Sequence, residues 1–514
     1  MSSVPDAEAL SLISGDGDRR ALRLGPLGRK GERAIVINCA AVGVVLLLLF
    51  VLERVGASDI VVGSASLSAP LASILILSWL GRSMEASTFL RADGAGGALV
   101  SGLAMTTEFS AILLVPAGLS AAYLRAGGTP WLVGAAVGFA AFAILVAPSL
   151  RRTGASGVID FLRMRLPQTG TARLARIVIA VCVTAVGAGL LWIEAALVNQ
   201  LAGLLGAAAG TSAMAVMVST ACAVVLLGGM QATTLVNAYL GFLVALAFTV
   251  PAVLAQAGLG VTIAALGPLS EVGSLLLAPL PGWSELAFVV LGTMSIPIWA
   301  LRQSAVGRGR ASQPYAWALL IGFVLVAALF VLPERPRSLS ETSRVLSLLP
   351  SLGWLTAVWG AMTMTLFVTA RAVMLLAGQP RTGPAGWLVR TAAIRFLALA
   401  GAGCLVWAGA SRNWVLEPWM MQALLTGAAV TLAPAVLAAV AWPRAEARGM
   451  ALAPLLGASG LALGWMGILS PALGAWVGLL SGAAAIVACG YLFDDRAWRM
   501  RWLNPTTAFP TAPN

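Results

Sequence analysis

Long apolar stretches recur along almost the whole chain, separated by short polar segments that are rich in arginine. A helix needs about 20 mainly apolar residues to cross a bilayer. Fourteen stretches approach this length and predict transmembrane helices, over residues 36–52, 62–80, 96–121, 131–149, 176–199, 211–229, 233–255, 284–301, 315–332, 352–377, 391–410, 417–441, 451–469 and 473–492. The pattern therefore predicts an all-α, polytopic membrane protein.

The polar ends and connections divide this predicted chain into seven parts. We expect a disordered cytoplasmic tail over 1–33, two peripheral helices over 34–95, five helices over 96–255, an external connection over 256–283, five more helices over 284–441, two peripheral helices over 442–492 and a cytoplasmic tail over 493–514. Each group of five holds an odd number of helices, so the two groups run in opposite orientations. This arrangement predicts a 5+5 inverted-repeat core, as in many transporters. Residues 151–175 between two spans combine arginines with apolar positions, which predicts a short amphipathic helix at the cytoplasmic surface.

The basic residues test this topology independently, because cytoplasmic loops of membrane proteins carry an excess of Lys and Arg. With the N-terminus inside, 25 of the 32 basic residues fall in cytoplasmic segments and 6 outside, while Arg371 falls within a span. Arg302, next to the end of the 284–301 span, is counted among the 25. The split predicts a multi-pass protein of a bacterial-type plasma membrane with both termini in the cytoplasm.

Composition narrows the function classes. Hydrophobic residues make up 59% and charged residues 10% of the 514, against about 45–50% and 25% in soluble domains, which excludes a soluble multidomain protein. The absence of histidine excludes a zinc-binding HExxH helix and a Ser-His-Asp triad, and the five cysteines are scattered singly. We therefore expect no enzyme and no resident cofactor.

We also expect no nucleic-acid partner, because the basic residues lie between apolar runs. The expected partners are the lipid bilayer and a small organic solute, and a small membrane subunit or a homo-oligomer stays open.

Two predicted spans contain interruptions that are typical of transport sites. Span 96–121 contains Thr106, Thr107 and Glu108 followed by Pro116, and span 284–301 contains a Gly-Ser-Pro cluster that ends at Pro297. Broken helices near the midplane offer backbone carbonyls and helix ends to a solute or ion. The alternative is a simple kink, because Gly and Pro are common in membrane helices.

Glu108 and Glu194 are acidic residues that lie well inside predicted spans. An unpaired charge at the bilayer centre costs ~2.5–3.5 kcal/mol on the insertion scale, so such a residue indicates function. Either carboxyl would serve an ion or proton site; the alternative is a protonated group in a packing hydrogen bond. Arg371 lies close enough to the cytoplasmic end of its helix to snorkel, and pairing with a carboxylate solute or with Glu108 is the alternative.

Span 352–377 adds Thr363 and Thr365 among small residues, in GAMTMT. Their hydroxyl oxygens suit a hard cation such as sodium. Threonines in membrane helices also commonly bond their own backbone, so this signal is weak by itself.

The order of these features resembles the sodium/solute symporter family, nearest its monocarboxylate (acetate-type) branch. LVAPSLRRTGASGVIDFLRMRL resembles the family's APYLRKFGAYTVPDFLGARY stretch, LLGGMQATTLVNAY its GGMRAVTWTQ segment, SIPIWALR its LPHxLMR motif and GAMTMTLFVTARAV its AAMSTADSLLL helix. The resemblance covers residues 78–395 and implies the inverted-repeat fold of the leucine transporter.

The resemblance also implies a sodium site between the spans at 96–121 and 352–377. Its carbonyl donors would be Thr106 and Phe109, and the opposite helix would contribute Gly360, Thr363 and Met364, with Thr365 as a substitute hydroxyl. The solute would lie near Glu108, Glu194, Trp192 and Pro297. This chain departs from the family pattern at Glu108, where the family has aspartate, at Met364, a poor sodium ligand, and at Ile298 in place of histidine.

The function that follows is cation-coupled, here sodium-coupled, symport of a small organic solute such as a monocarboxylate by alternating access. Two alternatives remain from the sequence: a proton-coupled transporter with Glu108 carrying the proton, and a sensor or receptor that retains the fold without coupled transport.

Overall fold

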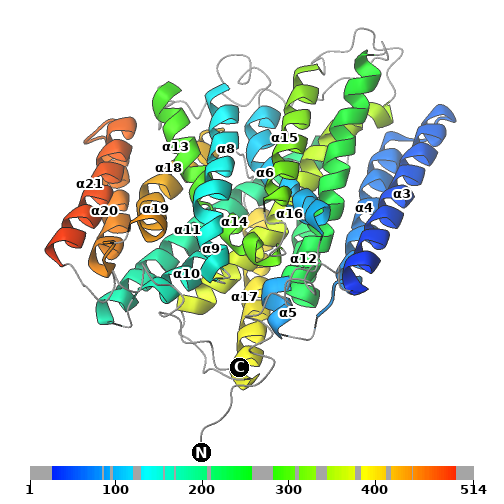
Figure 1. Cartoon of the computed structure of the whole chain (residues 1–514). Helices are drawn as coiled ribbons and strands as arrows, with labels where there is room; N and C mark the ends of the chain where they lie inside the picture. Colours follow the sequence, from blue (N-terminus) through cyan, green and yellow to red (C-terminus); the bar gives the residue numbers. More distant parts are fainter. Residues whose placement is uncertain are drawn as a thin grey trace, which may run out of the picture.

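The computed structural model describes residues 26–83, 86–92, 97–119, 129–153, 155, 157–166, 169–204, 210–256, 282–306, 312–331, 344–376, 384–411, 418–442 and 444–493. Within these ranges every element is helical, which confirms the predicted all-α fold class (Figure 1). Most of the predicted tails and of the external connection at 256–283 lies outside the described residues.

The helices follow one another in the order of the predicted spans. They are α3 (Pro26–Arg54), α4 (Asp59–Leu80), α5 (Ala86–Arg91), α6 (Ala98–Leu119), α8 (Thr129–Ala141), η2 (Phe142–Val146), α9 (Ala147–Thr153), α10 (Val158–Arg165), α11 (Gly170–Leu204), α12 (Gly210–Gln256), α13 (Gly282–Ser295), α14 (Pro297–Arg302), η4 (Gln303–Ala305), α15 (Gln313–Val331), α16 (Arg344–Leu376), α17 (Pro384–Ser411), α18 (Pro418–Thr431), α19 (Ala433–Ala441), α20 (Ala447–Trp465) and α21 (Pro471–Leu492). Each predicted span overlaps one of these elements, and α10 lies where the amphipathic helix was expected.

Several of these helices are long and apolar enough to cross a membrane. Among the described residues eight meet this test, and α18 with α19, bent by 42°, makes a ninth when taken as one span. The molecule is thus a polytopic membrane protein, while the number of fourteen crossings stays a prediction.

The first helix starts earlier than the predicted boundary. The polar tail was expected to extend to residue 33, but α3 already begins at Pro26. Proline is favoured in the first turn of a helix because its fixed φ suits the helix and its missing N–H is not needed there. The polar residues that follow it form the first turns of α3 instead of a tail.

The 47-residue helix α12 is two helices joined at a sharp kink, where Gly229 has φ 52° and ψ −127°. The indole of Trp359 in α16 donates a hydrogen bond to the Thr220 hydroxyl (3.1 Å), and Thr363 donates one to the Asn237 side chain (2.9 Å). In a straight helix, residues 220 and 237 would lie about 25 Å apart. Because both contact one short stretch of α16, the chain reverses direction at Gly229.

Two glycines allow close packing between the two predicted groups of five helices. A Cβ at Gly102 of α6 would lie 2.6 Å from Trp317 of α15, and one at Gly138 of α8 would lie 2.5 Å from the Val290 carbonyl of α13. The first helix of each predicted repeat thus packs on the second helix of the other. This exchange is compatible with two repeats of opposite orientation, and the repeats and their boundaries stay predictions.

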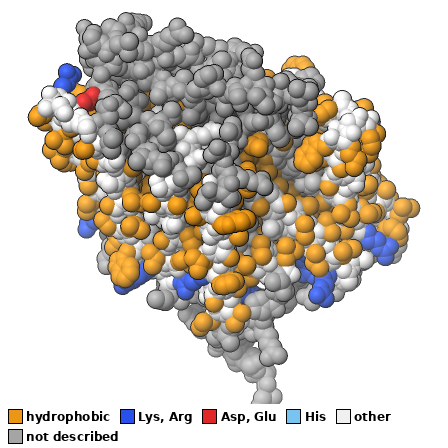
Figure 2. All heavy atoms as spheres, turned by 180° about the vertical axis from the view of Figure 1, so that it is seen from behind, with side chains coloured by type: hydrophobic (Ala, Val, Ile, Leu, Met, Phe, Trp, Pro, Cys, Tyr) orange, Lys and Arg blue, Asp and Glu red, His pale blue; other side chains and the backbone are white. Residues whose placement is uncertain are grey.

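The predicted peripheral helices lie at opposite flanks of the molecule, α3 and α4 at one side and α20 and α21 at the other (Figure 1). Large apolar side chains are exposed over much of the surface. Figure 2 shows them covering the middle of one face, with Lys and Arg side chains along its lower edge. This distribution suits a bilayer around the middle and water at the edge.

Candidate functional site

A fully buried ion pair between Glu108 of α6 and Arg302 of α14 forms the centre of the candidate site. The guanidinium donates from Nη2 to Oε1 and from Nε to Oε2 (3.3 Å), so both carboxylate oxygens face it. Its remaining amino group, Nη1, donates to the Thr234 hydroxyl of α12 (2.8 Å). Such a two-pronged geometry is the strongest that Arg and a carboxylate form. Because both side chains are buried, each charge depends on the other.

Asn237 of α12 connects this pair to two further helices. Its amide nitrogen donates to Oε1 of Glu108 (2.8 Å), and its side-chain oxygen accepts from the Thr363 hydroxyl of α16 (2.9 Å). Its backbone carbonyl accepts from the Thr107 hydroxyl of α6 (2.6 Å). The polar cluster of Thr107, Glu108, Thr234, Asn237, Arg302 and Thr363 thus joins α6, α12, α14 and α16 inside an otherwise apolar core.

The break between α13 and α14 positions the guanidinium. The helix stops at Ser295, Ile296 is extended (φ −59°, ψ 125°), and Pro297 starts α14. The Trp299 indole donates back across the break to the Thr293 carbonyl (2.8 Å). The predicted interruption at Pro297 is therefore observed, and it sets the direction of the short helix that ends in Arg302.

The sequence also predicts a helix break in span 96–121. The structure shows no break at Thr106, Thr107 or Glu108. α6 runs from Ala98 to Leu119 as one helix, and the hydroxyls of Thr106 and Thr107 also bond carbonyls four residues earlier (2.9 and 3.3 Å). The physical reason lies in the neighbours: Arg302 and Asn237 satisfy Glu108 through side chains, so the backbone does not have to open.

The position of Arg302 corrects one assignment in the predicted distribution of basic residues between the two sides of the membrane. The sequence placed it with the cytoplasmic residues, but the structure buries it completely against Glu108. Without Arg302, 24 of the 25 basic residues assigned to the cytoplasmic side remain, against 6 outside. The expected orientation therefore does not change.

Glu194 of α11 lies in a different environment. Its Oε1 accepts a hydrogen bond from the Thr365 hydroxyl (2.9 Å), while its Oε2 is buried without a hydrogen-bond partner among the described residues. No described cation is paired with this carboxyl. A buried carboxylate without a cation is strongly disfavoured, so the neutral acid is the stable form. The two intramembrane acids thus differ in their partners: Glu108 is paired with a guanidinium, whereas Glu194 accepts a hydrogen bond from Thr365.

Thr363 and Thr365 point to opposite sides of α16. Thr363 faces Asn237 of α12, and Thr365 faces Glu194 of α11. Both hydroxyls also bond their own helix, at Gly360 and Ala361. The two hydroxyls therefore do not converge on one ion in this conformation.

The other predicted site residues are spread around these helices. Gly360 contacts α6, since a Cβ there would lie 2.2 Å from Cγ2 of Thr107. The Phe109 ring turns away and packs on Phe139 (centroids 4.8 Å apart). Met364 is buried, whereas Trp192, two positions before Glu194, lies on another face of α11 and is 37% exposed.

Sodium, as a transported ion, would need several oxygens that converge. In this conformation the carbonyls of Thr106 and Phe109 belong to an unbroken helix, Met364 offers only sulfur, and a guanidinium supplies the positive charge beside Glu108. The described residues also contain no group of three or more His, Cys, Asp or Glu side chains for a metal. The predicted sodium ligands do not form a cation cage here.

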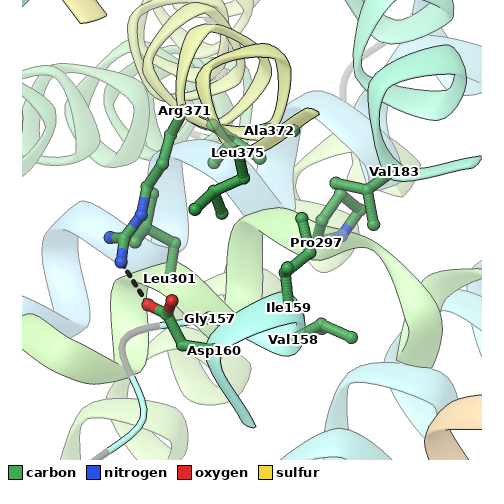
Figure 3. A pocket seen from close by; sticks show the side chains of 11 residues that line it. Gly157, Val158, Ile159, Asp160, Val183, Pro297, Leu301, Arg371, Ala372 and Leu375 are labelled. Atoms are coloured by element: carbon green, nitrogen blue, oxygen red, sulfur yellow. Dashed lines mark hydrogen bonds and ion pairs between the residues drawn. The ribbon is translucent and has the colours of Figure 1, made fainter. Parts of the chain in front are cut away.

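Arg371 forms a second ion pair, with Asp160 of α10 (Nη2 to Oδ2, 2.5 Å). Its carboxylate partner in this structure is therefore Asp160 and not Glu108. The pair lines a hollow between α10, α11, α14 and α16 that includes Pro297 and Leu301 (Figure 3). Leu301 immediately precedes Arg302, so α14 separates the hollow from the polar cluster.

Sequence patterns do not single out Thr107, Thr234, Asn237 or Arg302 as partners. The available signal is modest: TTLVN places three polar residues inside one apolar span, and SIPIWALR carries an arginine five positions after the proline. Pairing them with Glu108 requires knowing how the helices cross.

These helices define a polytopic α-helical membrane protein with a buried polar cluster in its core. The fold is similar to that of a solved Na+-coupled sialic acid symporter in a substrate-bound, outward-open state, for which a novel Na+ site is described. The similarity covers 84% of this chain and 98% of the other, with a TM-score of 0.58 and 12% sequence identity. No protein-family model matches the sequence, and no curated protein matches it.

Proposed function

We propose that this protein is a secondary active transporter that couples entry of a small organic solute to a cation by alternating access. The observation that carries this proposal is the buried Glu108–Arg302 pair, which with Asn237 and Thr363 joins helices of both predicted repeats. Charged residues inside a membrane protein commonly mark a transport pathway. The break at Ile296 beside the pair gives the second repeat a point at which it bends.

Sodium is the first coupling ion to test, because the fold resembles that of a Na+-coupled symporter. Its predicted ligands would have to converge in another conformation, with α6 opened near Thr106 and α16 rotated. Each co-transported sodium contributes ~2.3 kcal/mol per 100 mV of membrane potential, about fifty-fold accumulation.

A proton is the second candidate, favoured by Glu194. Its buried carboxyl has a single hydrogen-bond partner, Thr365, and no described cation. A group that is protonated when buried and loses its proton when wetted carries a proton as the pathway alternates.

The proposed solute is a small monocarboxylate, following the sequence resemblance, and the proposed location is a bacterial-type plasma membrane with both termini inside. Uptake of short carboxylates into proteoliposomes under separate sodium and proton gradients tests the proposal. Accumulation driven by either gradient supports transport and identifies the ion. Solute binding without uptake or counterflow would contradict transport and favour the sensor.

A further inference from the structure

Arginines from three helices lie close together at the predicted cytoplasmic edge of the protein. Arg163 of α10 interacts electrostatically with Arg176 of α11 and with Arg390 of α17. Arg173, about one turn before Arg176, interacts with it as well and adds a fourth positive charge. We call these four residues the arginine cluster. Because α10 packs on α11 and α11 packs on α17, the cluster is a product of the fold and not of one basic segment.

The charges of the cluster repel one another. Arg163, Arg176 and Arg390 are each only partly exposed, so water screens their repulsion less than it would on an open surface. Asp160 lies within electrostatic reach of Arg390, but its carboxylate is also paired with Arg371 (2.5 Å). This carboxylate is therefore shared between two arginines, and an anion from outside the chain would reduce the repulsion among the others.

Exposed apolar side chains lie directly beside the arginine cluster. Leu174 is exposed between Arg173 and Arg176 in α11. Leu388 is exposed two positions before Arg390 in α17. Figure 2 shows the same relation on one whole face, where Lys and Arg side chains follow the lower edge of an apolar surface. The cluster thus has the surroundings of a site where lipid head groups meet acyl chains, which favours a lipid over a soluble acidic protein that would match the charges alone.

We propose that the arginine cluster binds the head group of an anionic phospholipid, with the phosphate oxygens on the guanidinium groups and the acyl chains along the exposed apolar side chains of α11 and α17. Arginine suits this role because its planar guanidinium donates two parallel hydrogen bonds to a phosphate. Basic pockets between membrane helices on the cytoplasmic side are typical sites for such head groups. A lipid with two phosphates, such as cardiolipin, matches the charge of the cluster better than a lipid with one.

A bound lipid has a structural consequence for α10. Phosphate oxygens on Arg390 leave the Asp160 carboxylate to Arg371, and this ion pair joins α10 to α16 (Figure 3). Lipid binding therefore strengthens the contact between α10 and α16 while it links α10, α11 and α17. Because a ligand of the folded state stabilises that state, the lipid raises the melting temperature. The site is independent of the proposed transport activity, since it needs neither the solute nor the coupling ion.

Titration of the purified, delipidated full-length protein with cardiolipin in detergent, followed by native mass spectrometry, tests the proposal. Phosphatidylglycerol, phosphatidylcholine and inorganic phosphate are the chemical controls. We expect cardiolipin to bind most tightly and phosphatidylglycerol more weakly. Phosphatidylcholine should bind only at background level, because its ammonium group meets the arginines. Inorganic phosphate lacks acyl chains and should not displace cardiolipin at concentrations at which the lipid saturates the site.

Replacing two arginines of the cluster at once gives the main variant. Arg163→Gln with Arg390→Gln should weaken cardiolipin binding roughly thirty-fold, because each arginine near a membrane surface contributes separately to the attraction of anionic lipid. The matched control is Arg33→Gln with Arg448→Gln, which removes the same charge from exposed positions of α3 and α20. This control variant should bind cardiolipin as the unmodified protein does.

A substitution of opposite sign separates lipid binding from general damage. Asp160→Asn removes the carboxylate that competes with phosphate for the guanidinium groups, so it should tighten cardiolipin binding several-fold. A gain of affinity requires a folded site, and this result therefore holds even if the double arginine variant folds poorly. Weaker binding by Asp160→Asn would overturn the site.

Thermal unfolding gives the same comparison in a bilayer. The melting temperature of the unmodified protein should be higher in nanodiscs of equal parts phosphatidylcholine and cardiolipin than in nanodiscs of phosphatidylcholine alone. The double arginine variant should lose this difference and the control variant should keep it. Equal binding of cardiolipin and phosphatidylcholine, unchanged lipid binding by the folded double variant, or an equal loss in the control variant would each overturn the proposal. Displacement of cardiolipin by inorganic phosphate or polyglutamate would show a general anion site and overturn the assignment to lipid.

Discussion

Arg302 donates hydrogen bonds to both carboxylate oxygens of Glu108, which lies 194 positions earlier in the chain, and both side chains are completely buried. The pair connects the first helix of one predicted repeat to the broken first helix of the other. Removing either partner leaves a buried charge alone, whereas removing both does not.

Arg302→Met or Glu108→Gln alone should therefore destabilise the protein, by ~3–5 kcal/mol where an uncompensated charge remains. The double variant should recover much of this loss. Thermal unfolding of the two single variants and the double variant in nanodiscs measures these differences, with Arg448→Met as a control for loss of an arginine. Losses that simply add in the double variant would show that the two residues do not depend on each other.

Thr363 and Thr365 should act independently, because they face different helices. Thr363→Ala should couple to Asn237→Ala, with which it shares a hydrogen bond, and not to Thr365→Ala beyond ~0.3–0.5 kcal/mol. Double-mutant cycles based on thermal unfolding measure the coupling energy of each pair of substitutions. If the two threonines jointly bind sodium in another state, the double alanine variant also loses sodium-stimulated uptake in proteoliposomes. Unchanged uptake and sodium dependence would exclude them as ligands.

Glu194→Gln should preserve the acceptor for the Thr365 hydroxyl and imitate the neutral acid, so the melting temperature should change little. If Glu194 carries the coupled proton, proton-driven accumulation disappears while solute counterflow, which needs no net proton movement, persists. Full accumulation driven by a pH gradient would contradict a coupling role.

Gly360→Ala should force α6 and α16 apart, since the new Cβ would lie 2.2 Å from Cγ2 of Thr107. The loss of stability from this clash should exceed the ~1 kcal/mol by which replacing Gly with Ala normally stabilises a helix. Gly403→Ala in α17, where a Cβ meets no atom within 4 Å, is the matched control and should be neutral or stabilising. Equal melting temperatures for the two variants would contradict close packing at Gly360.

The sequence predicts helix positions well because the bilayer imposes one strong requirement, a long apolar segment, and each predicted span overlaps a helix. It also predicts the break at Pro297, where the ring prevents a regular helix. It misplaces Arg302, because an arginine directly after an apolar run looks like a loop residue. Only the ion pair of Arg302 in α14 with Glu108 in α6 reveals that this arginine lies inside.

The expected opening of α6 fails for a related reason. A cluster such as Thr106-Thr107-Glu108 indicates that polar groups need partners, but it does not distinguish a bound ion from side chains of other helices. Asn237 and Arg302 meet that need here.

The separation of Glu108 and Arg302 along the chain also bears on biogenesis. At roughly 5–20 residues per second, synthesis over the separation of 194 positions takes roughly 10–40 s. During this interval α6 has left the ribosome while α14 does not yet exist, so Glu108 has no guanidinium to meet. The buried ion pair can therefore form only after both halves of the core have been synthesised. Its formation marks the assembly of the two halves, and not the folding of either half alone.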